Sequence, residues 1–181
     1  MNQADKESRL SRETWLQQAL DTLANDPEHL RIDELAERLG VSKGSFYWHF
    51  ENRADFIQAM AEYWRDKYTS EIRDEVIAAD DHLRAILEEV LIENAGRYDL
   101  AVRSWARHEP SINSVIREVD KIRLQTLRDI FIKLGFDDPE ARTRARVFVA
   151  CHSLEDALSI PLTRKEAREQ VELRHAFFTR R

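Results

Sequence analysis

The stretch from Val41 to Phe50, VSKGSFYWHF, places four aromatic residues and a histidine in five consecutive positions. A buried helix spaces its apolar residues three and four apart, and a half-buried strand alternates them, so this run fits neither pattern. Phe46 and Phe50 are four apart and would share one face of a short helix, while Tyr47 and Trp48 would point outward. Bulky exposed aromatic side chains are unexpected unless a partner covers them. The run therefore predicts a short helix with an apolar inner face and an aromatic outer face.

The composition predicts an all-α, intracellular protein. Only four Gly and four Pro occur among 181 residues, which favours long helices with few tight turns. The single cysteine, Cys151, excludes an internal disulfide and fits a reducing cytoplasm. No apolar run approaches the roughly 18 residues needed to cross a bilayer, so no membrane partner is expected.

Three short helices and one long helix are expected around the aromatic run. Apolar residues at helical spacing predict helices over residues 11–24 and 32–39, and Gly40 would end the second, since glycine adopts the left-handed conformation without steric cost. The aromatic run forms the third, and a long helix is expected over 53–78. Further helices are expected near residues 82–95, 98–107, 112–134, 139–159 and 164–178.

An amphipathic helix, a tight turn and a second short helix have the layout of a helix-turn-helix, in which the second helix enters the DNA major groove. The flat faces of Tyr47 and Trp48 suit thymine methyl groups and sugar edges, and His49 can donate to a phosphate. Lys43 lies in the first turn, the part of such a helix that meets base edges. We therefore expect a helix-turn-helix domain over residues 1–53 and a helical domain over residues 54–181.

The segment IDELAERLGVSKGSFYWHFENRADFIQAM, residues 32–60, resembles the DNA-binding module of the TetR family of bacterial transcription regulators. The resemblance extends over roughly residues 8–65 at the level of motifs. It implies base contacts from Lys43, Ser45, Tyr47 and Trp48. It implies backbone contacts from Ser42, Gly44, Tyr47, His49 and Arg53. Arg31 stands where relatives often carry a capping Thr; it can reach a phosphate but cannot cap the helix by accepting a hydrogen bond.

Charge raises an objection, because DNA-binding surfaces are usually basic. The net charge is −6, and residues 1–53 carry 7 Lys or Arg against 10 Asp or Glu. The acidic balance predicts a modest affinity for non-specific DNA. Specific binding would then depend more on dimer formation and on direct contacts to the bases. The acidic balance also supports the alternative hypothesis, a helical protein–protein adaptor that uses the helix-turn-helix shape without specific DNA binding.

The chain has no HExxH motif and no glycine-rich phosphate loop, so no enzyme, cofactor or metal is expected.

In TetR-like proteins the C-terminal helices form a homodimer and often enclose a small-molecule site. Helical stripes near the end of the chain suggest an interface formed by Val147, Cys151, Leu154, Leu158, Val171 and Phe178. Aromatic and polar residues near Pro110 suggest an effector site formed by Tyr98, Arg103, Trp105 and His108. The family resemblance thus implies a homodimeric repressor that binds a pseudo-palindromic operator and is released by a ligand.

Overall fold

The computed structural model describes residues 10–26 and 30–180, together with their side chains apart from that of Asp156. Every regular element in this part of the chain is a helix, which confirms the all-α prediction. The α-helices are α2 (Arg12–Asn25), α3 (Ile32–Leu39), α4 (Lys43–Phe46), α5 (Arg53–Arg65), α6 (Glu71–Ile77), α7 (His82–Leu91), α8 (Asp99–Trp105), α9 (Asn113–Lys133), α10 (Asp138–Ser153) and α11 (Arg164–Thr179). A π-helix, η2 (Asp66–Ser70), joins α5 to α6, and two short 3₁₀ helices are η3 (Pro110–Ile112) and η4 (Glu155–Ala157).

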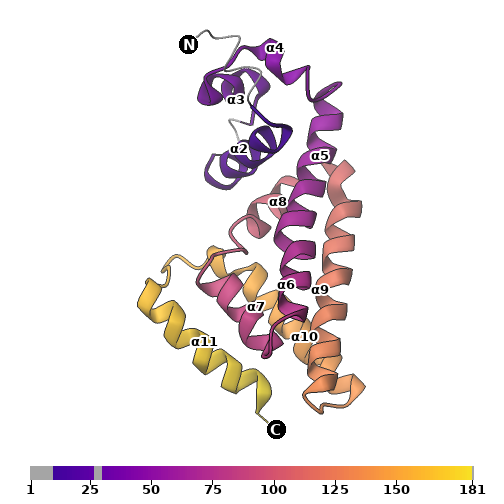
Figure 1. Cartoon of the computed structure of the whole chain (residues 1–181), viewed down its shortest axis with the longest axis vertical. Helices are drawn as coiled ribbons and strands as arrows, with labels where there is room; N and C mark the ends of the chain where they lie inside the picture. The colour runs from indigo at the N-terminus through magenta and orange to yellow at the C-terminus, as the bar shows by residue number, and fades with distance from the viewer. Residues whose placement is uncertain (1–9, 27–29, 181) are drawn as a thin grey trace.

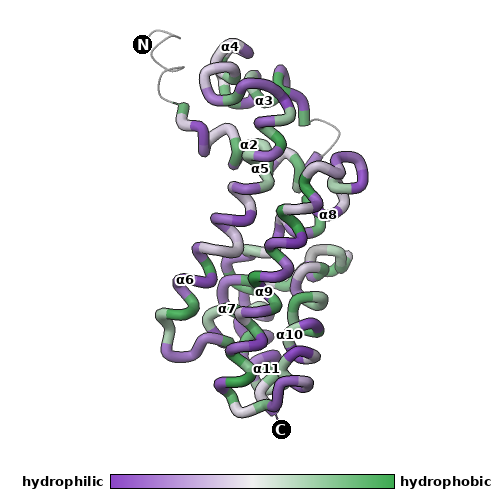
Figure 2. Tube along the Cα trace, turned by 90° about the vertical axis from the view of Figure 1, so that its right-hand side faces the viewer, coloured by the Kyte–Doolittle hydropathy of each residue, from purple (hydrophilic) through white to green (hydrophobic). Residues whose placement is uncertain are grey.

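The molecule is elongated, with α2, α3 and α4 gathered at one end (Figure 1). The continuous run α5–η2–α6 leads away from that end, and α9 lies beside it for much of its length. Helices α7, α10 and α11 form the opposite end. Seen from the side, apolar residues alternate with polar ones along each helix rather than forming a continuous apolar span (Figure 2). In the described part of the chain, no helix is long and apolar enough to cross a bilayer.

Local hydrogen bonds explain where the first helices begin and end. Ser11 accepts a hydrogen bond from the Thr14 backbone N–H at 3.2 Å and caps α2. Asn52 accepts from the Asp55 N–H at 3.0 Å and caps α5. Gly40 ends α3 in the predicted left-handed conformation, with φ 69°.

The N-terminal helices share an apolar core with the helices below them. Phe46 packs edge-on against Trp15, with ring centroids 5.6 Å apart, and also contacts Phe56 of α5 at 5.3 Å. The same cluster of buried residues continues through Trp64 and includes Val119 of α9. The apolar core therefore continues without a break across the domain boundary predicted after residue 53.

Two predicted helices differ from the structure. The helix expected over residues 53–78 is interrupted by the π-turn η2, which hydrophobic spacing does not reveal. The helix expected over residues 139–159 ends at Ser153 and is followed by a 3₁₀ turn. Leu158 consequently has extended backbone and does not continue the stripe that begins at Val147.

Candidate nucleic-acid interface

The turn between α3 and α4 fixes the orientation of the aromatic segment. The Gly40 N–H donates to the Glu37 carbonyl at 3.0 Å, and the Val41 N–H donates to the Ala36 carbonyl, also at 3.0 Å. This pair of bonds is the Schellman arrangement, which closes a helix and turns the chain sharply. Ser42 lies at the N-cap position of α4, although its side chain makes no capping hydrogen bond there.

The aromatic segment is a short α-helix that tightens toward its end. After four α-helical residues, the backbone N–H groups of Tyr47, Trp48 and His49 donate to carbonyls three residues earlier, at 3.0–3.3 Å. Bonds from i to i−3 are those of a 3₁₀ turn, in which side chains spread more widely around the axis. This geometry allows adjacent aromatic residues to face opposite environments.

Burial separates the run into the two predicted faces. Phe46 and Phe50 are 0% and 2% exposed, and they pack in the core of the N-terminal helices. Trp48 is 86% exposed and Tyr47 is 57% exposed. An indole that folding leaves almost wholly in water contributes little to stability, because apolar surface stabilises a fold only where it is removed from water. The outer aromatic face is thus available to a partner.

Ser45 does not fit the predicted base contacts. It is 2% exposed, and its Oγ is buried without a hydrogen-bond partner among the described residues. A buried hydroxyl cannot reach a base edge, so Ser45 is a residue of the interior.

The cationic residues near this face already have carboxylate neighbours. Arg53 donates from Nη1 to Glu109 Oε2 at 3.0 Å, which joins α5 to the segment before η3. Arg31 lies 3.5 Å from Asp33 and has no capping bond, as its chemistry predicts. Lys43 and Gly44 are exposed, and His49 is half-buried. A phosphate approaching Arg53 would therefore compete with a carboxylate.

The four predicted effector residues lie outside the wall of the cavity described below. Tyr98 is buried in the core and donates its hydroxyl to Asp21 Oδ1 at 2.5 Å; burial and this carboxylate raise the pKa of the phenol. Arg103 pairs with Asp120 at 2.5 Å. Trp105 packs against the core, and His108 is exposed. None of these four residues lines the cavity that the structure contains nearby.

That cavity lies between the η2–α6 run, α7, α9 and α10. The polar or charged residues in its wall are Tyr68, Thr69, Arg73, Asp99, Arg123, Thr126, His152 and Ser153. The sequence carried a signal for some of them: Arg123 lies between Val119 and Leu127 on the buried stripe of α9, and a charge on such a stripe indicates a buried partner.

Helix α10 has one buried and one exposed stripe. Phe148 and His152 face inward, whereas Val147 and Cys151, and Leu154 just after the helix, are exposed. Cys151 and His152 therefore face different environments, which does not suit joint binding of one ion.

Val147, Cys151, Leu154 and Leu158 are exposed and stay a prediction for the interface, whereas the prediction for α11 is wrong. Val171 and Phe178 are 2% and 5% exposed and pack within the subunit, with the Phe178 ring 5.0 Å from Phe148. Buried side chains cannot form a contact between subunits. The exposed apolar residues of α11 are instead Leu173 and Phe177.

Comparison with known proteins identifies the class of the N-terminal module. Residues 17–60 match the model of the family "Bacterial regulatory proteins, tetR family". Over 57 residues the chain is 44% identical to the tetracycline repressor protein class C of Escherichia coli; the match covers 30% of this chain and 26% of that protein. The likeness to this relative thus concerns about a quarter of its length.

Solved structures extend the likeness to the whole fold. A transcriptional regulator from Rhodococcus sp. Rha1 superimposes with a TM-score of 0.75 at 23% identity, covering 93% of this chain and 96% of that one. A protein from Rhodococcus sp. assigned to the TetR family gives a TM-score of 0.65 at 20% identity, covering 93% and 98%. Residues 17–60 thus resemble the DNA-binding module of the TetR family of bacterial regulatory proteins, and the chain as a whole has the fold of these solved regulators.

Proposed function

We propose that the protein regulates transcription by binding double-stranded DNA through the outer face of α4 and the turn that follows it. One observation carries this proposal: Trp48 and Tyr47 are exposed directly beside Phe46 and Phe50, which are buried. Helix α4 lies at one end of the molecule (Figure 1), and the exposure of Tyr47 and Trp48 leaves their rings accessible to a partner there. Flat aromatic rings at the end of a helix-turn-helix suit contacts to base edges and sugars.

Residues around the aromatic face supply contacts to the DNA backbone. Lys43, Arg31 and Arg53 offer positive charge, and Ser42, Gly44 and His49 offer close approach or hydrogen bonds. Arg53 would exchange Glu109 for a phosphate. The few cations on this surface suit a protein with modest affinity for random DNA and a marked preference for its operator.

A homodimer would supply the second set of contacts. The exposed side chains of α10 and the segment after it, namely Val147, Cys151, Leu154 and Leu158, and those of α11, namely Leu173 and Phe177, would pack against the same residues of a second copy. Two copies of α4 related by a two-fold axis would enter successive major grooves. The operator would then be pseudo-palindromic, with half-sites centred about one helical turn apart (~34–36 Å).

The dimer would act in the cytoplasm as a repressor that a small molecule releases from its operator. The effector would bind in the cavity beside η2, in place of the site expected around Tyr98, Arg103, Trp105 and His108. Support comes from the position of that cavity, whose wall includes Tyr68 of the helical run that begins at Arg53.

Selection of bound duplexes from a random pool, followed by footprinting, tests this function. The proposal expects enrichment of an inverted repeat and protection on one face of the duplex. Enrichment of no common sequence, with no protection at concentrations that saturate random DNA, would favour the adaptor hypothesis.

A further inference from the structure

The cavity beside η2 has a mainly apolar wall drawn from several helices. The apolar residues of the wall include Ile72, Ile86, Leu127 and Phe148, from α6, α7, α9 and α10 respectively. Gly96 closes one side, where a Cβ would lie 3.4 Å from the His152 carbonyl oxygen. An apolar wall of this kind binds a ligand mainly through the area removed from water.

The charges in the wall are already neutralised. Arg123 forms a bidentate pair with Asp99, whose side chain is only 1% exposed. Arg73 pairs with Asp74, from Nη2 to Oδ1 at 2.7 Å. An anionic ligand would therefore find no unpaired cation, and a cationic ligand no unpaired carboxylate. A charged molecule would lose its hydration without full compensation.

His152 is a buried polar residue of the cavity wall, and only one of its two ring nitrogens has a hydrogen-bond partner among the described residues. Its Nδ1 lies 2.7 Å from the Phe148 carbonyl oxygen, and a carbonyl only accepts, so Nδ1 carries the proton. The ring is 5% exposed and stacks on Phe148 with centroids 4.0 Å apart. Burial lowers the pKa of His152 to about 4, so the imidazole is neutral near pH 7. Nε2 is then an acceptor, and it is buried without a hydrogen-bond partner among the described residues.

We infer that the cavity takes a neutral, mainly apolar small molecule bearing one O–H or N–H group, whose hydrogen bond Nε2 of His152 accepts. A buried acceptor without a partner costs free energy, and a ligand donor would remove that cost. The inference names the effector class for the proposed ligand-responsive function and rests on that function for its biological role. The binding itself requires no DNA.

Matched two-ring probes test the inference by calorimetric titration of the full-length protein at pH 7. 2-Naphthol has the apolar body and one donor, naphthalene has only the body, 2-methoxynaphthalene has an acceptor in place of the donor, and 2-naphthoate is an anion. We expect 2-naphthol to bind about tenfold more tightly than naphthalene or 2-methoxynaphthalene, the effect of one hydrogen bond to a buried acceptor. 2-Naphthoate should bind most weakly.

The substitution His152→Phe keeps a stacked ring and removes the acceptor. It should abolish the preference for 2-naphthol while naphthalene still binds. His82→Phe is the matched control, because His82 also bonds a backbone carbonyl, that of Val76 at 2.8 Å, and lies outside the cavity wall. The control should keep the tenfold preference. If His152→Phe does not fold, the ¹⁵N resonance of Nε2 in the unaltered protein provides the test, since it should shift with 2-naphthol and not with naphthalene.

Three results would overturn the inference: equal affinity for 2-naphthol and naphthalene, a preference that survives in His152→Phe, or no binding of any neutral probe. If the proposed DNA-binding function is wrong, the ligand-binding measurements are not affected. A protein that binds no operator would still show the probe preference, and addition of 2-naphthol to a gel shift tests release separately.

Discussion

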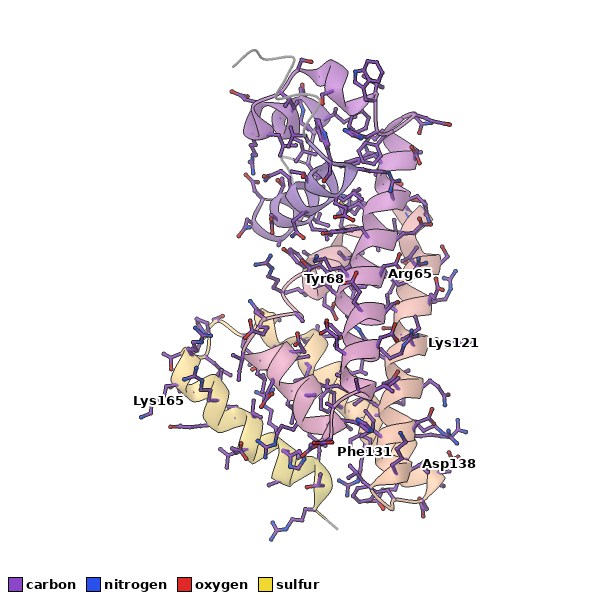
Figure 3. The ribbon with its side chains drawn as sticks, in the orientation of Figure 1. Arg65, Tyr68, Lys121, Phe131, Asp138 and Lys165 are labelled. Carbon is purple, nitrogen blue, oxygen red and sulfur yellow. The ribbon has the colours of Figure 1, made fainter. Side chains whose placement is uncertain are left out.

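Arg123 donates a hydrogen bond from Nη2 to the backbone carbonyl of Tyr68, across 3.1 Å. Tyr68 lies in the π-turn η2, and the same guanidinium donates from Nε to Thr69 Oγ1 at 3.1 Å. The Tyr68 hydroxyl donates in turn to Gln17 Oε1 of α2 at 3.0 Å. Tyr68 lies where the N-terminal helices meet the rest of the molecule (Figure 3). A single side chain thus separates an arginine of the cavity wall from the proposed DNA-binding module.

Arg123→Met should destabilise the protein by about 3–5 kcal/mol, because it leaves the carboxylate of Asp99 buried without its partner. The double variant Arg123→Met with Asp99→Asn should recover much of that loss, since no buried charge remains. Arg128→Met is the control on the same helix; its partners Asp129 and Asp138 are about half exposed, and it should cost under about 1 kcal/mol. Urea unfolding measures all three. Equal losses for Arg123→Met and Arg128→Met would contradict this account of the buried pair.

Ser45→Ala should leave operator affinity unchanged and raise the free energy of unfolding by up to about 1 kcal/mol. The substitution removes a buried hydroxyl that has no partner and places a better helix former in α4. A gel shift and thermal unfolding together measure this. Loss of operator affinity in a folded Ser45→Ala protein would restore the role in base contact that the sequence alone suggested.

His152 should make the protein more stable as pH rises from about 4 to about 6.5. In that window the unfolded histidine binds a proton while the buried one, with its pKa lowered to about 4, does not. The unfolded state therefore binds more protons, and the free energy of unfolding rises with pH, by at most about 3 kcal/mol. The difference in stability between the unaltered protein and His152→Phe isolates this contribution. A difference that stays constant across the window would show that the histidine titrates normally.

Leu173→Glu with Phe177→Glu should convert a dimer to monomers and weaken operator binding. Each charge would be buried twice in a symmetric contact, and a monomer holds only one half-site. Ile77→Glu is the control, an equally exposed apolar residue on α6. Sedimentation should give half the mass for the double variant and an unchanged mass for the control. Dimers that persist in a folded double variant would place the interface elsewhere.

Much of the N-terminal module could be predicted because its signals are local. The left-handed Gly40, the caps at Ser11 and Asn52 and the two faces of the aromatic run all follow from backbone preference and helical spacing. Ser45 was mispredicted because a family pattern assigns a role by position, whereas burial depends on how tightly the short helix turns.

The C-terminal part was less predictable because its features depend on packing between distant segments. Helix α10 carries two stripes, and spacing does not tell which one faces the subunit interior. On α11, Val171 and Phe178 contact residues from other helices, so their burial follows from tertiary structure. The cavity likewise brings together residues as far apart in the sequence as Thr69 and His152. The one local signal for it was Arg123, a charged residue on the apolar stripe of α9.

Gel-shift titration of Trp48→Ala against the selected operator, with circular dichroism on the same samples, tests the central claim most directly. Trp48 is 86% exposed, so its removal should leave helicity and melting nearly unchanged. Specific binding should weaken by about 1–3 kcal/mol, while binding to random duplexes changes little. Unchanged operator affinity in the folded variant would contradict the claim that this aromatic face reads DNA.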